Sequence, residues 1–327
     1  MEKNYYILSN GRLERKENTV NLDTGEDKKR IPVKNVGALQ ILGQVDLNTR
    51  FLSFLNQENV AAHFYNWFDR YTGSYYPQEY LNSGKLLVNQ VLCYHKKERR
   101  IRIAREIVRG ASSNMLKNLE YYKRKKKQVG EEKREIEKFR EQIPEITGMN
   151  NLLGLEGKIR EIYYRSFPKI LRSGFELEER TKRPPQNEVN AMISFGNSLL
   201  YSSTLTEIYK TQLNPTVSFL HEPRERRFSL SLDISEVFKP LIVDKSIFKL
   251  VNKQIIQSED FDRDLNGCLL SEKGKKEFIK EFESRLEKTV KVESLNKKVS
   301  QQRLLRLEAY KLAKHCLGDE KYESYKA

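Results

Sequence analysis

One histidine in this chain lies among residues that suit the chemistry of phosphodiesters. His221 belongs to a segment, residues 219–240, that reads FLHEPRERRFSLSLDISEVFKP. Two carboxylates follow it, Asp233 and Glu236, and three arginines lie beside it: Arg224, Arg226 and Arg227. Carboxylates and an imidazole can bind a hard divalent cation such as Mg²⁺ or Mn²⁺, and arginines can bind phosphates. The segment therefore predicts a metal-dependent enzyme that cuts or joins a phosphodiester.

Each of these three candidate ligands also has a structural explanation. Residues 228–232 alternate like a strand, so Asp233 could cap the start of a helix and Glu236 could be an acid of its first turn. A lone histidine is more often structural than catalytic, as we expect for His63 in its apolar stretch. His221 differs because it lies in a polar loop, which favours a functional role over core filling.

A further ligand is expected from another part of the chain, because one imidazole and one or two carboxylates leave a metal ion short of ligands. Glu156 lies in the segment LLGLEGKIR, residues 152–160, at the expected start of a helix. An acid framed by leucines and glycines is expected to be partly buried, and a buried carboxylate requires a positive partner. That partner could be a metal ion, or it could be Arg160, which lies four residues further along.

A second basic segment precedes the histidine. Residues 181–185 read TKRPP and lead into Asn187, a plausible N-cap of the next helix. The prolines resist helix formation and should leave Lys182 and Arg183 directed outward. We expect both side chains to contact phosphates near the reacting bond, together with the three arginines beside His221.

A longer basic stretch points to a more extended polyanion surface. Residues 85–127 contain fourteen Lys and Arg against three acids. On a helix, Ile103 and Ile107 fall on one face, and three arginines fall on the opposite face: Arg102, Arg105 and Arg109. We expect this stripe to attract a polyanion such as nucleic acid, through its phosphates and without reading bases.

The composition agrees with a partner of opposite charge. The chain has 327 residues and a formal net charge of +15, which predicts attraction to nucleic acid or to an acidic membrane face. No apolar run approaches the ~18 residues that span a bilayer, and the first residues lack a signal-peptide core. Three widely spaced cysteines form neither a disulfide framework nor a zinc motif. We therefore expect a cytoplasmic protein.

The periodicity of the chain changes near residue 80, which predicts an α+β fold with two domains. A small β-rich domain, residues 1–80, should contain one helix at 47–55, a hairpin turn at Asn10-Gly11 and strands at 5–8, 19–22, 30–33, 37–42 and 60–65. Residues 81–327 should form an all-α catalytic domain. Its helices are expected at 131–142, 187–211, 236–257, 275–291 and 301–317.

Three central segments and the basic C-terminal helix together resemble a known family. Residues 152–164, 180–201 and 219–240 closely resemble the CRISPR-associated integrase, the nuclease of spacer acquisition. The resemblance implies that Glu156, His221 and Glu236 bind Mg²⁺ or Mn²⁺. It also implies that Asp233, the first acid of a D-x-x-[DE] pair, assists from close by, and that Asp233 and Glu236 could exchange these duties.

The same resemblance implies a reaction and partners. The 3′-hydroxyl of an incoming DNA fragment would attack a phosphodiester in the CRISPR repeat. The chain would form a homodimer largely through its β domain, and two dimers would flank a dimer of the small partner protein of the adaptation complex.

Two other functions share most of these features. A non-catalytic nucleic-acid clamp would have the same charge and helices but no metal, and a repair nuclease would have the same site but no partner. A membrane-surface protein is disfavoured, because the basic stretches lack the large apolar face of an interfacial helix.

Overall fold

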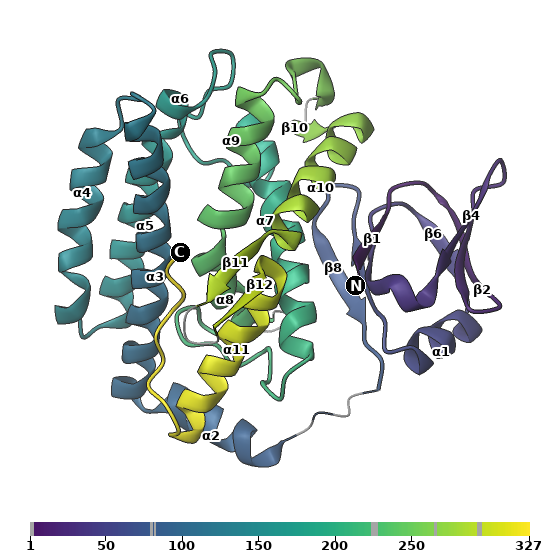
Figure 1. The fold of residues 1–327 in the computed structure, drawn as a ribbon, viewed down its shortest axis with the longest axis horizontal. Coiled ribbons are helices and arrows are strands. Elements are labelled where there is room, and N and C mark those ends of the chain that lie inside the picture. The colour runs from purple at the N-terminus through teal and green to yellow at the C-terminus, as the bar shows by residue number, and fades with distance from the viewer. Residues whose placement is uncertain (1–2, 79–80, 82, 224–227, 265–266, 293–295) are drawn as a thin grey trace. The chain divides into compact units, whose positions relative to one another are not determined.

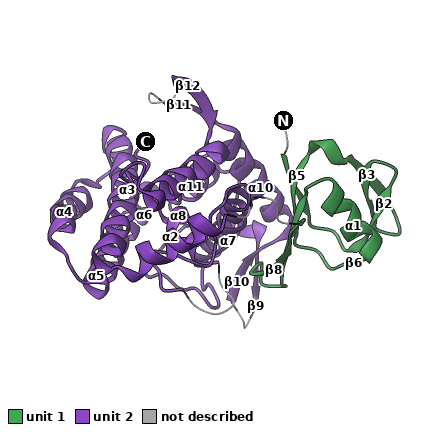
Figure 2. Ribbon diagram, turned by 90° about the horizontal axis from the view of Figure 1, so that it is seen from below, with its two compact units in different colours: residues 1–82 green, residues 83–327 purple. Residues whose placement is uncertain are grey.

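The computed structural model of the chain divides into two compact units, residues 1–82 and 83–327 (Figures 1 and 2). It describes all residues except 1–2, 79–80, 82, 224–227, 265–266 and 293–295. Strands dominate the first unit and helices dominate the second. The predicted α+β fold, with a strand-rich N-terminal part before a helical part, is therefore confirmed.

The described residues of the first unit form two four-stranded sheets. One sheet has the order β1 (Lys3–Ile7), β5 (Val36–Ile41), β7 (Ala61–Tyr65) and β8 (Tyr71–Tyr75). The other has the order β4 (Lys28–Pro32), β3 (Thr19–Asp23), β2 (Gly11–Lys16) and β6 (Val45–Leu47). Helix α1 (Thr49–Gln57) packs its buried face, which includes Phe51 and Phe54, into the core that the strands share.

The expected hairpin turn at Asn10-Gly11 is wrong, because β1 and β2 belong to different sheets. β1 instead pairs in parallel with the fully buried β5. The side chain of Asn10 accepts a hydrogen bond from the backbone N–H of Gln44, at 2.8 Å. The pairing of β1 with β5, which is distant in sequence, buries more apolar surface than a local hairpin at Asn10-Gly11 would.

The second unit is built from ten helices within the described residues. These are α2 (Gly84–His95), α3 (Lys97–Arg124), α4 (Gly130–Glu141), α5 (Met149–Arg165), α6 (Phe167–Ile170), α7 (Glu188–Tyr209), α8 (Ser229–Phe238), α9 (Lys245–Asn252), α10 (Glu272–Glu287) and α11 (Gln301–Leu317). The helices expected at 131–142, 187–211 and 301–317 are confirmed. None of the helices in the described part is long and apolar enough to cross a membrane.

Two short pairs of antiparallel strands occur among the described residues of this unit. The expectation that it is all-α is therefore wrong in this detail. β9 (Phe261–Asp264) pairs with β10 (Gly267–Leu270), and β11 (Thr289–Val292) pairs with β12 (Lys297–Ser300). The helix expected at 275–291 therefore ends at Glu287, before β11 begins. The cysteines Cys93, Cys268 and Cys316 are all free and buried, so none of them forms a disulfide.

The strand expected at residues 228–232 is wrong, and so is a helix that begins at Glu236. Helix α8 already begins at Ser229. Helices α3, α7 and α11 pack against it (Figure 1), so nearly all of its residues are buried. Small serines alternate with leucines because both faces of the helix meet neighbours, and Ser235 contacts the hydroxyl of Thr204 at 3.1 Å. A helix buried all round lacks the amphipathic period that identifies surface helices.

Helix α3 fastens the two helices that carry the candidate carboxylates. The side-chain amide of Asn118 donates to the hydroxyl of Tyr163 on α5 and to the carbonyl of Pro240, both at 2.8 Å. The amide of Asn114 donates to the carbonyl of Val237 on α8 at 2.9 Å. Pro240 begins a single π-helical turn, Pro240–Asp244 (η3). These buried bonds fix α5 and α8 against one scaffold.

Candidate active site

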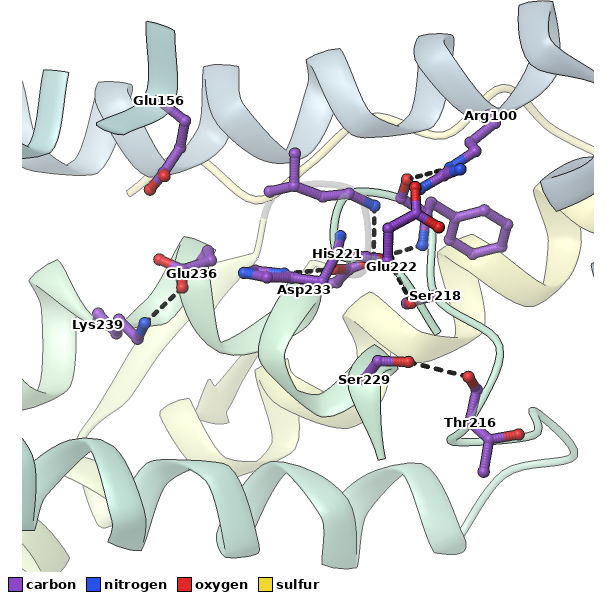
Figure 3. A network of polar contacts seen from close by, with 12 residues as sticks. Arg100, Glu156, Thr216, Ser218, His221, Glu222, Ser229, Asp233, Glu236 and Lys239 are labelled. Atoms are coloured by element: carbon purple, nitrogen blue, oxygen red, sulfur yellow. Dashed lines mark hydrogen bonds and ion pairs between the residues drawn. The ribbon is translucent and has the colours of Figure 1, made fainter. Parts of the chain in front are cut away.

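Asp233 is a fully buried carboxylate that organises the histidine loop (Figure 3). It accepts hydrogen bonds from the backbone N–H groups of Phe219, Leu220 and His221 at 2.6, 2.9 and 3.0 Å. It also contacts Nδ1 of the His221 ring at 2.8 Å. A buried carboxylate needs such donors to replace its hydration. One side chain therefore fixes both the backbone and the ring of His221.

The expected helix-capping role of Asp233 is consequently wrong. Asp233 is the fifth residue of α8, whose N-cap position, Phe228, makes no side-chain capping bond. Glu236 correspondingly lies in the last turn of α8 and not in its first. The backbone N–H groups that donate to Asp233 belong to residues 219–221, in the loop before α8.

Further contacts of this loop involve residues that sequence reasoning missed. The guanidinium of Arg100 on α3 donates from Nε to the carbonyl of Phe219 at 2.9 Å and from Nη2 to Glu222 at 2.7 Å. Ser218 donates its hydroxyl to the carbonyl of His221 at 2.7 Å. Arg100 is one of many basic residues in its stretch, so no local signal distinguishes it from its neighbours.

The environment of His221 favours its positive form. Burial lowers the pKa of the imidazole, but the hydrogen bond and charge of Asp233, together with the charge of Glu236, raise it further, so the pKa lies above its ordinary value. Asp233 can only accept when ionised, so Nδ1 carries the proton that points to it. The other ring nitrogen, Nε2, can then donate to a phosphate when the ring is protonated, and it can bind a cation only when the ring is neutral.

Glu156 and Glu236 converge on one guanidinium. Arg160 contacts Oε1 of Glu156 through Nε at 2.8 Å and Nη2 at 2.6 Å, and the same Nη2 atom contacts Oε2 of Glu236. Lys239 contacts the other oxygen of Glu236. Figure 3 shows the Glu156 side chain directed toward Glu236, with the imidazole of His221 nearby. The helix that carries Glu156 thus also carries the positive partner of both carboxylates.

The position of Glu156 differs from the expectation, and its burial agrees with it. Glu156 lies in the middle of α5, whereas the start of a helix was expected. Its side chain is 19% exposed, so it is partly buried as expected. Arg160, one of its two expected positive partners, contacts it at 2.6 Å.

Glu236 is held in its ionised form. Its side chain is 7% exposed, and this burial raises its pKa. The positive charges of Arg160, Lys239 and His221 more than offset the burial, so the pKa lies well below its usual range. Asp244 is also buried, and here burial prevails over the charges of Arg160 and Lys239 and raises the pKa to about 7.

The donor set has the chemistry of a divalent-cation site, although its side chains are not grouped as one. Among the described residues, no three His, Cys, Asp or Glu side chains lie close enough together to hold a metal ion. The guanidinium of Arg160 lies against both carboxylates. Two carboxylates that already share a positive group, beside an imidazole oriented by Asp233, are donor types that suit Mg²⁺ or Mn²⁺. The donor types of Glu156, His221 and Glu236 are therefore those that such an ion binds.

Of the residues expected to contact phosphates near the site, two are described by the structure and three are not. Lys182 and Arg183 are exposed on the loop before α7. Partial desolvation lowers the pKa of Lys182, and so do the charges of Arg180, Lys239 and Arg160, while Glu236 opposes them. Lys182 therefore lies beside the carboxylate cluster. Three expected contacts lie outside the described residues: Arg224, Arg226 and Arg227.

The three arginines of α3 do not form a uniform surface. Arg102 is exposed. Arg109 is partly exposed and paired with Glu106 at 2.7 Å. Arg105 donates from Nε to the carbonyl of Ile146 at 2.7 Å, so its guanidinium holds the connection into α5.

Comparison with known proteins agrees with the fold and the segments that carry the site. A family model described as CRISPR associated protein Cas1 matches residues 5–284. The CRISPR-associated endonuclease Cas1 3 of Thermodesulfovibrio yellowstonii is 47% identical over 326 residues, which cover 99% of each chain. A solved Cas1 structure from Thermotoga maritima is 40% identical, with a TM-score of 0.89, and the match covers 99% of this chain and 100% of that one.

A more distant solved structure shares the fold alone. A casposase bound to integration product has a TM-score of 0.89 at 20% identity, and the match covers 98% of this chain and 92% of that chain. The family resemblance drawn from residues 152–164, 180–201 and 219–240 is confirmed by the family model and by the closely similar relatives. The chain belongs to the Cas1 family of CRISPR-associated proteins.

Proposed function

We propose that this chain is a divalent-metal-dependent DNA endonuclease and integrase that inserts DNA fragments into a CRISPR array. One observation carries the proposal: Glu156 and Glu236 share a guanidinium, while Asp233 orients His221 toward the same cluster. Family membership supports it, because the similar relatives are named CRISPR-associated endonucleases. Glu156, His221 and Glu236 are the proposed ligands of Mg²⁺ or Mn²⁺.

The proposed reaction exchanges one phosphodiester for another. The 3′-hydroxyl oxygen of the fragment forms a bond to phosphorus in the repeat, and the bond from that phosphorus to the 3′-oxygen of the cut strand breaks. The proton of the attacking hydroxyl is lost, and the departing oxygen gains one. A bound divalent cation would supply a Lewis acid that polarises a phosphate oxygen and stabilises the charge of the transition state.

The remaining residues orient the site and attract the substrate. Asp233 fixes the tautomer and direction of the imidazole, as carboxylates behind metal-binding histidines do. Lys182 and Lys239 place positive charge beside Glu236, where DNA phosphates would approach. The side chains that would act on the DNA are thereby held in place before it binds.

A strand-joining assay tests this function. The purified chain is mixed with a target DNA and a labelled fragment that ends in a 3′-hydroxyl, with Mn²⁺ or with a chelator. We expect covalent joining with Mn²⁺ and none with the chelator, because the phosphate charge would lack its Lewis acid. A fragment with a blocked 3′ end is the matched control and should not be joined.

The other outcomes separate the competing functions. Metal-dependent cutting of branched DNA without any joining would reject the integrase and leave a repair nuclease. DNA binding with neither cutting nor joining would reject catalysis and leave a non-catalytic clamp.

DNA affinity should fall steeply as salt rises. The net charge of +15 predicts that several phosphates are neutralised, and six contacts would give a slope of about −5 in log affinity against log salt. In fluorescence anisotropy, the Lys182→Gln/Arg183→Gln double variant should reduce this slope by about two. Lys276→Gln, which removes a lysine paired with Glu272 on α10, should leave the slope unchanged. An equal slope for all three proteins would reject the phosphate role of the loop.

The proposed partners follow from the family resemblance. We propose that the chain forms a homodimer largely through its strand-rich unit and assembles with the small dimeric partner protein of the adaptation complex. The strong positive charge supports DNA as the third component. Light scattering on the purified chain measures the dimer, and a monomeric mass at working concentration would contradict it.

A further inference from the structure

We propose that Arg160 and a divalent cation compete for the same two carboxylates, so that the ion binds only when the guanidinium releases Glu156 and Glu236. The inference deepens the proposed function and rests on it, because it concerns the same ligands. It assigns to Arg160 the role of a built-in counter-ion that sets how tightly the site holds metal.

The geometry places the guanidinium where the two carboxylates meet. Nη2 of Arg160 contacts Oε1 of Glu156 and Oε2 of Glu236, so a single nitrogen atom joins α5 to α8. The Arg160 side chain is only 17% exposed, which limits screening by water. A cation that ligates both glutamates must take up the same small region and replace these charge-assisted bonds.

The charges around Arg160 explain why a counter-ion is needed there. Glu156, Asp233 and Glu236 bring three carboxylates into one partly buried region. Lys239 neutralises one oxygen of Glu236, and Asp233 is satisfied by N–H groups and His221. Without Arg160, the two glutamates would lack their shared positive partner, and their like charges would repel each other.

A released guanidinium has other acceptors within its own neighbourhood. Tyr164 lies one helical turn beyond Arg160, and the two side chains are hydrogen-bonded. The charge of Arg160 also lowers the pKa of Asp244, so this buried carboxylate is close to it. The long arginine side chain could therefore change partners without leaving the site, which keeps the exchange of one cation for another local.

The test measures Mn²⁺ affinity directly, by isothermal titration calorimetry on chelator-treated protein. Removing the competing charge in Arg160→Gln should tighten Mn²⁺ binding by about tenfold or more. The same variant should unfold at a lower temperature than the wild type in chelator, because the carboxylates repel. Mn²⁺ should then raise its unfolding temperature by more than it raises that of the wild type.

Two further variants make the result interpretable. Arg160→Lys keeps a positive charge at the same position and should bind Mn²⁺ with an affinity near that of the wild type. Arg165→Gln is the matched control on the same helix, because it removes an exposed arginine paired with Glu135 at 2.6 Å. It should change neither the Mn²⁺ affinity nor the effect of Mn²⁺ on unfolding.

Failure of this inference differs from failure of the proposed function. If the wild type binds Mn²⁺ and Arg160→Gln binds it equally well or more weakly, competition is overturned, and Arg160 only supports the ligands. If the wild type does not bind Mn²⁺ at all, the metal site itself is rejected, and the inference falls with it.

Discussion

Strand joining by the His221→Ala variant is expected to fall by at least about a thousandfold, with DNA affinity within about twofold of the wild type. The substitution removes one of three proposed metal ligands and the only imidazole fixed by Asp233. The side chain is 32% exposed, so its loss should cost little folding free energy. Single-turnover joining kinetics and fluorescence anisotropy on the same DNA measure the two quantities separately.

The matched control is another histidine of the same unit. His95→Ala changes an exposed residue at the end of α2, away from the carboxylates of the site, and should leave the rate of joining unchanged. Joining that survives in His221→Ala would refute the ligand role of the imidazole. An equal loss of joining and of DNA affinity would instead assign His221 to substrate binding.

Replacing Asp233 with asparagine should lower the stability of the protein, although the two side chains have nearly the same shape. The Asp233 carboxylate accepts three backbone hydrogen bonds and contacts Nδ1 of His221. An amide would direct N–H donors at groups that are themselves donors, and it would leave the buried site without its negative charge. We expect the free energy of unfolding to fall by about 3 kcal/mol or more.

Urea unfolding measures the loss of stability, and nuclear magnetic resonance of the histidine rings reports on the site itself. Asp233 raises the pKa of His221, so the pKa should fall in Asp233→Asn. Asp262→Asn, which alters an exposed aspartate on β9, is the control and should change neither quantity. A His221 pKa that does not move in Asp233→Asn would show that the contact is not the cause of the shift.

Much of the architecture could be predicted from local sequence patterns. The helix at 301–317 and the short strands of the first unit have apolar periods that match their burial. Helix α8 could not be recognised in this way, because its alternating serines and leucines resemble a strand. Its residues are buried against α3, α7 and α11, and this packing, which the local sequence does not reveal, favours a helix there.

The site shows a similar division. The residue types around Glu156, His221 and Glu236 predict a metal site. Arg160 was recognisable as a partner of Glu156 because the two lie four residues apart on one helix. The bond from Arg160 to Glu236 joins residues 76 positions apart. The bond from Arg100 to the histidine loop joins residues more than a hundred positions apart. Such contacts depend on how the helices pack, and single-sequence periodicity carries no information about that.

The attachment of His221 to Asp233 also has an entropic consequence. A side chain that becomes immobile only when its ligand binds loses about 0.5–1.5 kcal/mol of conformational entropy at that step. Here the ring and its backbone are already immobilised by a carboxylate within the folded core. The conformational entropy of this residue is therefore lost when the protein folds, and it does not have to be lost again when DNA binds.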